Sequence, residues 1–404
     1  MGSPFIQVGG GVTAPRGFLA ASCYCGIKEG NLDKPDIALI YSSSPAVAAA
    51  TFTTNRVKAA PVKVSAAHLR SPEIRAIIAN SGNANACTGL GGIEHAKRMA
   101  QAAAAALGLK RNQVLVGSTG RIGIPLPIAK MEEAIKELPK ALRDDGSLKA
   151  ARAIMTTDTF PKEIAVELPL GGETVRLGGI AKGAGMIDPN MATMLCFLTT
   201  DAAVGKKDLA KALSVAVDQS FNRITIDGDM STNDTAILLA NGAAQSRPLD
   251  VSTRSFDLFQ RALNYVTAGL ARMIVEDGEG VSKFVEVHVK GAPTFQDARK
   301  AARAVARSTL VKCAWFGGDP NWGRIVDAIG YSSARIREEM VDVYYDGVIA
   351  VKNGMPSKTP VSKLRGVVAN ERFKITIDLQ LGSAEYTVYT TDLTVKYVEL
   401  NMGE

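Results

Sequence analysis

The sequence contains few of the residues that most often build metal sites or nucleophilic triads. Among 404 residues there are three histidines and five cysteines, and no histidine lies near a cysteine pair. Cys23 and Cys25 are separated by one residue, which is too close for the C-x-x-C spacing of zinc and redox motifs. We therefore expect no metal, no serine triad, and reduced thiols of the kind found in cytosolic proteins.

Long hydrophobic runs are also absent. No stretch approaches the roughly eighteen consecutive apolar residues that a membrane-spanning helix needs. The first residues, MGSPFIQVGGGVTAP, show neither the basic-then-apolar order of a secretory signal nor the arginine-rich pattern of a transit peptide. These features predict a cytoplasmic protein with no membrane partner.

Signals for nucleic acids and nucleotides are missing as well. Aromatic residues make up 6% of the chain, and its 47 basic and 40 acidic residues are interspersed, for a formal net charge of +7. Nucleic-acid binders usually carry a concentrated basic stripe, so we expect no nucleic-acid partner. Neither G-x-x-x-x-G-K-[ST] nor a G-x-G-x-x-G that opens a helix occurs, which disfavours ATP and NAD.

The sequence does contain a mixture of helix and strand patterns, in a chain long enough for two sizeable domains or lobes. Strands are predicted at 36–41, 74–79, 114–117, 164–168, 174–177, 284–289 and 373–379, and helices at 93–107, 129–145, 208–221, 256–274 and 298–310. The proline at position 139 is expected to kink or break the helix at 129–145. The C-terminal part is dominated by strands. This distribution favours an α+β fold in layers over a doubly wound parallel sheet.

The segment 182–195, KGAGMIDPNMATML, carries the most specific chemistry. By pattern alone, its glycines and proline form a loop and Thr193 begins a buried strand. Threonine is a poor nucleophile without a neighbouring base, whereas an N-terminal threonine has its own α-amine, which titrates at roughly 7.7–8.0. Cleavage of the Ala192–Thr193 bond would free that amine, and the small Ala192 leaves room for the hydroxyl to attack. The residues alone permit either interpretation.

This segment resembles the cleavage site of the ornithine acetyltransferase (glutamate N-acetyltransferase) family, whose pattern is K-G-x-G-M-I-x-P-x-M-A-T-M-L. The similarity extends along essentially the entire chain. Further matching segments are GGVTAPRG at 10–17, NSGNANA at 80–86, STG at 118–120, MTTDT at 155–159, GDMSTNDT at 228–235 and GDPNWGR at 318–324. The sequence is therefore identified as a member of this self-cleaving family of arginine biosynthesis.

The resemblance implies a fold and a maturation step. The fold is a two-lobed α/β/β/α-like sandwich, of the type shared with self-processing aminopeptidases, with the nucleophile between the lobes. Autocatalytic cleavage gives an α chain, residues 1–192, with the oxyanion hole, and a β chain, residues 193–404, with the N-terminal threonine and the C-terminal strands. The two chains stay associated, typically as an α2β2 heterotetramer. No metal or organic cofactor is implied.

The resemblance also implies a reaction. Thr193 takes the acetyl group of N2-acetyl-L-ornithine as an ester and passes it to L-glutamate in a ping-pong cycle. Some relatives also use acetyl-CoA to make N-acetylglutamate, and the residues leave this second activity open. Two alternatives remain: a self-processing amidase or aminopeptidase with water as the acceptor, and an uncleaved metabolite-binding protein without catalysis.

Site residues are carried over position by position. The Thr119 hydroxyl and the Gly120 N–H match the oxyanion hole. Positions that contact substrate in the family match Thr159, Lys182, Thr193, Glu279 and Asn401. We assign Lys182 to the α-carboxylate that both amino acids share, and Glu279 to the side-chain ammonium of ornithine. The family usually continues beyond this asparagine to a tyrosine-and-hydroxyl segment; here Met402–Glu404 follow, so no contact from such a segment is carried over.

Overall fold

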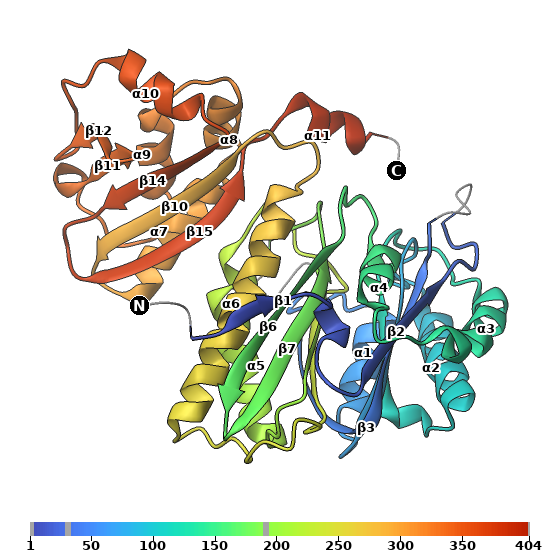
Figure 1. Ribbon diagram of the computed structural model, residues 1–404. Coiled ribbons are helices and arrows are strands. Elements are labelled where there is room, and N and C mark those ends of the chain that lie inside the picture. The colour runs from blue at the N-terminus through green and yellow to red at the C-terminus, as the bar shows by residue number, and fades with distance from the viewer. Residues whose placement is uncertain (1–3, 29–33, 189–193, 403–404) are drawn as a thin grey trace. The chain divides into compact units, whose positions relative to one another are not determined.

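A computed structural model describes residues 4–28, 34–188 and 194–402, which fold into two compact units (Figure 1). The first unit comprises the described residues of Met1–Gly183, Pro189–Asn222 and Met230–Ile274. The second comprises those of Ala184–Asp188, Arg223–Asp229 and Val275–Glu404. Each unit has its own apolar core. Within the described ranges, no helix is both long and apolar enough to span a bilayer.

The first unit is built on strands that are hydrogen-bonded in the order β1-β6-β7-β8-β9-β3-β4-β5, with β2 paired to β3. The strands are β1 (Ile6–Val8), β2 (Phe18–Cys23), β3 (Ile37–Phe52), β4 (Ile74–Asn80), β5 (Val114–Ser118), β6 (Lys162–Leu170), β7 (Glu173–Lys182), β8 (Leu195–Thr200) and β9 (Thr235–Ala240). The helices are α1 (Ala60–His68), α2 (Gly89–Leu107), α3 (Ile128–Glu137), α4 (Ser147–Ile154), α5 (Lys206–Gln219) and α6 (Arg254–Glu276).

The long strand β3 divides this sheet into two layers. Its first part pairs with β2 and β4, the register shifts between Tyr41 and Ala46, and the part from Val47 onward pairs with β9. Such an irregularity bends a strand. The layers enclose an apolar core in which Phe197 of β8 lies against Gly117 of β5; a Cβ on that glycine would be 3.2 Å from the ring.

Helices cover the outer faces of both layers. Ile77 of β4 lies in the core between the layers, whereas its neighbour Ile78 packs toward α1, α2 and α3, as the alternation of a strand requires. On the other side, Leu270 of α6 packs on Gly179 of β7, and α5 lies beside α6 (Figure 1). The first unit is therefore an α/β/β/α sandwich, and the predicted fold class is confirmed.

The second unit is a smaller α/β layer structure. Its sheet has the order β13-β12-β11-β14-β10-β15. The strands are β10 (Phe284–Ala292), β11 (Asp342–Tyr345), β12 (Val348–Lys352), β13 (Met355–Pro356), β14 (Arg372–Asp378) and β15 (Ala384–Thr391), and the helices are α7 (Phe295–Arg307), α8 (Thr309–Phe316), α9 (Trp322–Gly330), α10 (Val361–Val368) and α11 (Val395–Leu400). Alternate residues of β10, among them Val285 and Val287, pack against α7 in one buried cluster.

One predicted helix breaks at its proline, as expected, and another is wrong in extent. In the segment 129–145, α3 ends at Glu137 and Pro139 lies in the 3-10 turn that follows it. The helix predicted at 298–310 is interrupted at Ser308. There the backbone is extended and the hydroxyl accepts a bond from Val311 N, so that α8 begins as a new helix.

The predicted division between residues 192 and 193 concerns a covalent bond and stays a prediction. Packing follows a different division, because β7 precedes that bond, β8 follows it, and the two strands are hydrogen-bonded neighbours in the first unit. Ala192 and Thr193 themselves lie outside the described residues.

Candidate active site

The residues that directly follow the predicted nucleophile are held in the central part of the first unit. Met194, the residue after Thr193, accepts a hydrogen bond at its carbonyl from Thr235 N at 2.9 Å. β8 begins at Leu195, which pairs with Lys182 on one side and with Thr235 on the other. Lys182 is thus opposite the first residue of the strand that the predicted nucleophile precedes in the sequence.

The Lys182 ammonium contacts two threonine hydroxyls. Its Nζ donates to Thr156 Oγ1 at 2.7 Å and to Thr119 Oγ1 at 3.4 Å. The side chain is only 9% exposed and lies 3.9 Å from Asp158 Oδ2. The Thr119 oxygen accepts a hydrogen bond from the Lys182 ammonium, so the hydroxyl proton points away from Lys182. The neighbouring positive charge makes this proton a stronger hydrogen-bond donor than that of an isolated threonine. Such a hydroxyl suits a negative charge that develops on a substrate oxygen.

Asp158 is the buried counter-ion of this cluster. Its Oδ1 accepts from Lys162 Nζ and from Gly183 N, each at 2.7 Å, and its Oδ2 accepts from Thr156 N at 2.9 Å. Burial alone would raise the pKa of this carboxyl group, but the charges of Lys182 and Lys162 outweigh burial and lower the pKa to about 2. Asp158 is therefore a carboxylate at any physiological pH.

We expect Asp158→Asn to destabilise the first unit by about 3–5 kcal/mol, because it removes the carboxylate from two buried ammonium groups. Asp145→Asn, at an exposed carboxyl group of the same unit, is the control and should cost less than about 0.5 kcal/mol. Urea unfolding curves measure both. A loss no larger than that of the control would contradict this role.

The stability difference between wild type and Asp158→Asn should depend on pH in the acid range. The folded-state pKa of Asp158 is depressed to about 2, so its stabilising contribution is complete above the unfolded value of about 3.9 and is lost as the pH falls toward 2. The stability difference between wild type and Asp158→Asn should therefore shrink between pH 4 and 2, a range set by these two pKa values.

Buried asparagines fix the turn that carries Thr119. The backbone N–H of Thr119 donates to Asn80 O at 3.0 Å, and the Ser118 hydroxyl donates to Asn80 Oδ1 at 2.6 Å. Asn233 Nδ2 donates to the carbonyls of Ser118 and Ala84 at 2.8 and 2.6 Å. The matching segments at 80–86 and 228–235 thus serve to position the predicted oxyanion hole.

Gly120 occupies a position that only glycine fits. Its φ of +128° is a conformation that side chains rarely adopt. A Cβ there would lie 2.3 Å from the carbonyl carbon of Gly82 and 2.5 Å from Asn83 N. The backbone at residues 82 and 83 therefore passes directly against the turn, and this contact sets the direction of the peptide group at Gly120.

Two other predicted substrate contacts meet in the second unit. Asn401 Nδ2 donates to Glu279 Oε2 at 2.8 Å. The Glu279 carboxylate, which is 9% exposed, also packs on Gly185, where an added Cβ would be 2.5 Å from its carbon atom. The pair links α11 to the loop that follows α6, across 122 residues of sequence.

The structure thus brings Thr119 together with Lys182, and Glu279 together with Asn401. Thr159 is exposed and directly follows the buried Asp158. Sequence reasoning did not single out the residues that hold the first pair: Thr156, Asp158 and Lys162. The sequence does contain one indication of them: the matching segment MTTDT includes an acidic residue, and a lysine follows that residue four positions later.

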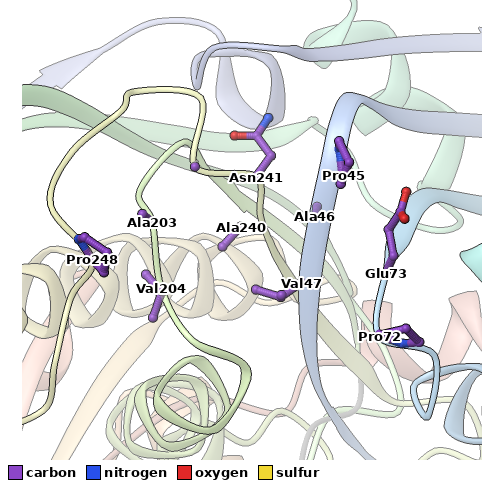
Figure 2. Close-up of a pocket in the computed structure, with 11 residues that line it drawn as sticks. Pro45, Ala46, Val47, Pro72, Glu73, Ala203, Val204, Ala240, Asn241 and Pro248 are labelled. Carbon is purple, nitrogen blue, oxygen red and sulfur yellow. The ribbon is translucent and has the colours of Figure 1, made fainter.

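A cavity of about 350 Å³ in the first unit lies elsewhere (Figure 2). It is lined by Ala240 at the far end of β9, five residues beyond Thr235, which corresponds to about 16 Å along the strand. Prolines and small apolar residues form most of its wall, and Glu73 is the one charged side chain that lines it. This cavity offers no hydroxyl or cation for acyl chemistry, so we place the candidate site at the Lys182 cluster.

Fixed hydrogen-bond donors beside a buried cation suit the oxygen that becomes negative when a carbonyl group is attacked. Together with the helix-covered sandwich around them, they place the chain among α/β/β/α enzymes of acyl transfer.

Comparison with known proteins narrows this class. Residues 19–403 match the ArgJ family. The arginine biosynthesis bifunctional protein ArgJ of Symbiobacterium thermophilum is 48% identical over 97% of this chain and 98% of its own length. The glutamate N-acetyltransferase of Methanocaldococcus jannaschii is 47% identical over 98% of each chain. A crystal structure of arginine biosynthesis bifunctional protein argJ from Bacillus halodurans has a TM-score of 0.50 and 36% identity, and covers 52% of this chain and 98% of the solved chain. This chain belongs to the ArgJ family, and the resemblance seen in the sequence is confirmed.

Proposed function

We propose that this protein is a glutamate N-acetyltransferase of arginine biosynthesis, which transfers acetyl from N2-acetyl-L-ornithine to L-glutamate through an ester on Thr193. The names of the two relatives above support the reaction and the pathway. The observation that carries the proposal is the contact of Lys182 with the Thr119 hydroxyl, opposite the start of β8. This contact supports a role for the Thr119 hydroxyl as a polarised donor, because Lys182 pairs with the first residue of β8.

Self-cleavage precedes acetyl transfer. The Thr193 hydroxyl attacks the Ala192 carbonyl, the acyl group moves from nitrogen to oxygen, and water hydrolyses the resulting ester. This frees the α-amine of Thr193 and leaves a new carboxylate on Ala192. The solved Bacillus halodurans chain supports such a division, because 98% of it corresponds to only 52% of this chain.

Acetyl transfer follows with the free amine as the base. It accepts the Thr193 hydroxyl proton as the oxygen attacks the acetyl carbonyl, and then returns a proton to the departing amine of ornithine. The glutamate amine attacks the acetyl ester in the second half of the cycle. In both halves the tetrahedral oxygen is stabilised by the Thr119 hydroxyl and the Gly120 N–H.

Substrate recognition uses the charged groups at either end of an amino acid. Lys182 binds the α-carboxylate, with Thr159 as a further contact. Glu279 binds the side-chain ammonium of ornithine, held in place by the amide of Asn401. Hydrogen bonds within the described part of the chain occupy only Oε2 of Glu279, which leaves Oε1 for the ammonium.

Threonine, its amine and the two donors supply all the required chemistry, so no metal or organic cofactor takes part. Acetyl-CoA is the candidate second donor, because the Symbiobacterium relative is named a bifunctional protein. The cleaved chains form an α2β2 heterotetramer in the cytoplasm, without nucleic acid.

The test is an assay with both substrates. Purified protein incubated with N2-acetylornithine and glutamate should form ornithine and N-acetylglutamate in equal amounts. Ornithine without N-acetylglutamate would indicate the hydrolase alternative, and binding without either product would indicate a metabolite-binding protein. Replacing acetylornithine by acetyl-CoA tests the second activity separately.

A further inference from the structure

The short segment 184–188 belongs to the second unit and is held there by hydrogen bonds at several points. Asp227 accepts from Met186 N at 2.6 Å through one carboxylate oxygen and from Ile187 N at 2.9 Å through the other. The carbonyl of Ile187 accepts from Ile226 N at 2.6 Å, and the carbonyl of Ala184 accepts from Glu279 N at 3.0 Å. Four backbone groups between Ala184 and Ile187 are thus held by partners that are distant in sequence.

Asp188 ends this segment with a buried ion pair. Its side chain is 1% exposed, lies 2.8 Å from Arg303 Nη2, and also pairs with Arg307. The two arginines are four residues apart on α7 and therefore project from the same face of the helix. A carboxylate buried against two guanidinium groups holds its backbone in one place, because moving it would expose unpaired charge to an apolar environment.

The segment precedes the proposed cleavage bond in the sequence, whereas the partners named above follow it. Residues 184–188 precede Ala192, whereas Ile226, Asp227, Glu279 and both arginines follow Thr193. Asp188 is four residues before Ala192. The family pattern K-G-x-G-M-I-x-P leaves position 188 unspecified, so the resemblance does not imply this ion pair.

We propose that the ion pair of Asp188 with Arg303 and Arg307 positions the chain for self-cleavage. By fixing the backbone shortly before the scissile bond, it limits the conformations from which the Thr193 hydroxyl must reach the Ala192 carbonyl. After cleavage the same contacts hold the end of the α chain on the β chain. This inference rests on the proposed cleavage. Asp188 and the arginines are positioning residues, because their proposed effect on the scissile bond acts through the backbone at residue 188.

The test compares two aspartates of the second unit in the full-length protein. Asp188→Asn removes the charge that pairs with α7. Asp342→Asn is the matched control, because Asp342 is 2% exposed and accepts from Lys352 Nζ at 2.7 Å but has no contact with segment 184–188. Each protein is made by pulsed cell-free synthesis, and loss of the uncut 42.6 kDa chain is followed by intact mass spectrometry.

We expect Asp188→Asn to slow cleavage at least tenfold and Asp342→Asn to cleave at the wild-type rate. Arg307→Gln changes a side chain that is 40% exposed, so it should disturb folding less than Asp188→Asn. It should slow cleavage severalfold, and it keeps the test informative if Asp188→Asn folds poorly. Wild-type rates in both Asp188→Asn and Arg307→Gln, or equal slowing by Asp342→Asn, would overturn the positioning role while leaving the proposed function intact. A wild-type protein that is never cut would instead overturn the proposed mechanism and this inference with it.

Discussion

Thr193→Ala should leave the 42.6 kDa chain whole and abolish acetyl transfer. The variant lacks the hydroxyl that attacks the Ala192 carbonyl, so no N-terminal amine is formed. It also lacks the oxygen that carries the acetyl group, so both stages fail for one reason. Denaturing mass spectrometry measures the first loss, and the two-substrate assay measures the second.

Two further threonine variants test whether the effect is due to the hydroxyl group of Thr193. Thr193→Ser keeps a hydroxyl and should still yield fragments and activity, at reduced rates. Thr157→Ala removes an exposed hydroxyl from the matching segment at 155–159 and should behave as wild type. Fragments or turnover in Thr193→Ala would show that another residue is the nucleophile.

Gly120→Ala should reduce kcat about 10²–10³-fold, the usual effect of losing one oxyanion-hole donor. The added methyl group would meet backbone atoms of Gly82 and Asn83 at 2.3 and 2.5 Å, and neither can move as a flexible side chain would. The turn must shift, and the Gly120 N–H and the Thr119 hydroxyl shift with it. Steady-state kinetics of the cleaved enzyme, normalised to the amount of free N-terminal threonine, measures the loss.

Gly123→Ala is the control for backbone strain. Gly123 also has a positive φ, +85°, but an added Cβ would meet nothing within 4 Å. It therefore carries the conformational cost of the substitution without the collision. If the two variants lose kcat equally, strain in the loop explains the effect, and the direction of the Gly120 peptide group does not matter.

Local patterns predicted much of the fold. The hairpin of β6 and β7 follows from two apolar runs joined by Gly171 and Gly172, and α2 ends at Leu107 because Gly108 adopts the left-handed conformation. The course of β3 could not be read in this way. Its second part is rich in alanine and lacks a clear alternation, and it becomes a strand through pairing with β9, which is distant in sequence.

In the candidate site, too, some features follow from the sequence and others depend on contacts between distant segments. Thr119, Lys182, Glu279 and Asn401 are predicted from positions that match the family, whereas no spacing rule joins Glu279 to a residue 122 positions away. Asp158 was overlooked because a single aspartate among threonines looks like any polar turn. Only its burial between Lys162 and Lys182 reveals why the segment contains it. The fixed segment 184–188 likewise depends on α7, which sequence spacing does not connect to it.

The central claim is that the Ala192–Thr193 bond is cut so that Thr193 becomes an N-terminal nucleophile. N-terminal sequencing of an active preparation, separated under denaturing conditions, tests it most directly. The account predicts two fragments, one of which begins Thr-Met-Leu-Cys. A single 42.6 kDa species with full acetyltransferase activity, or a fragment that begins at another residue, would contradict it.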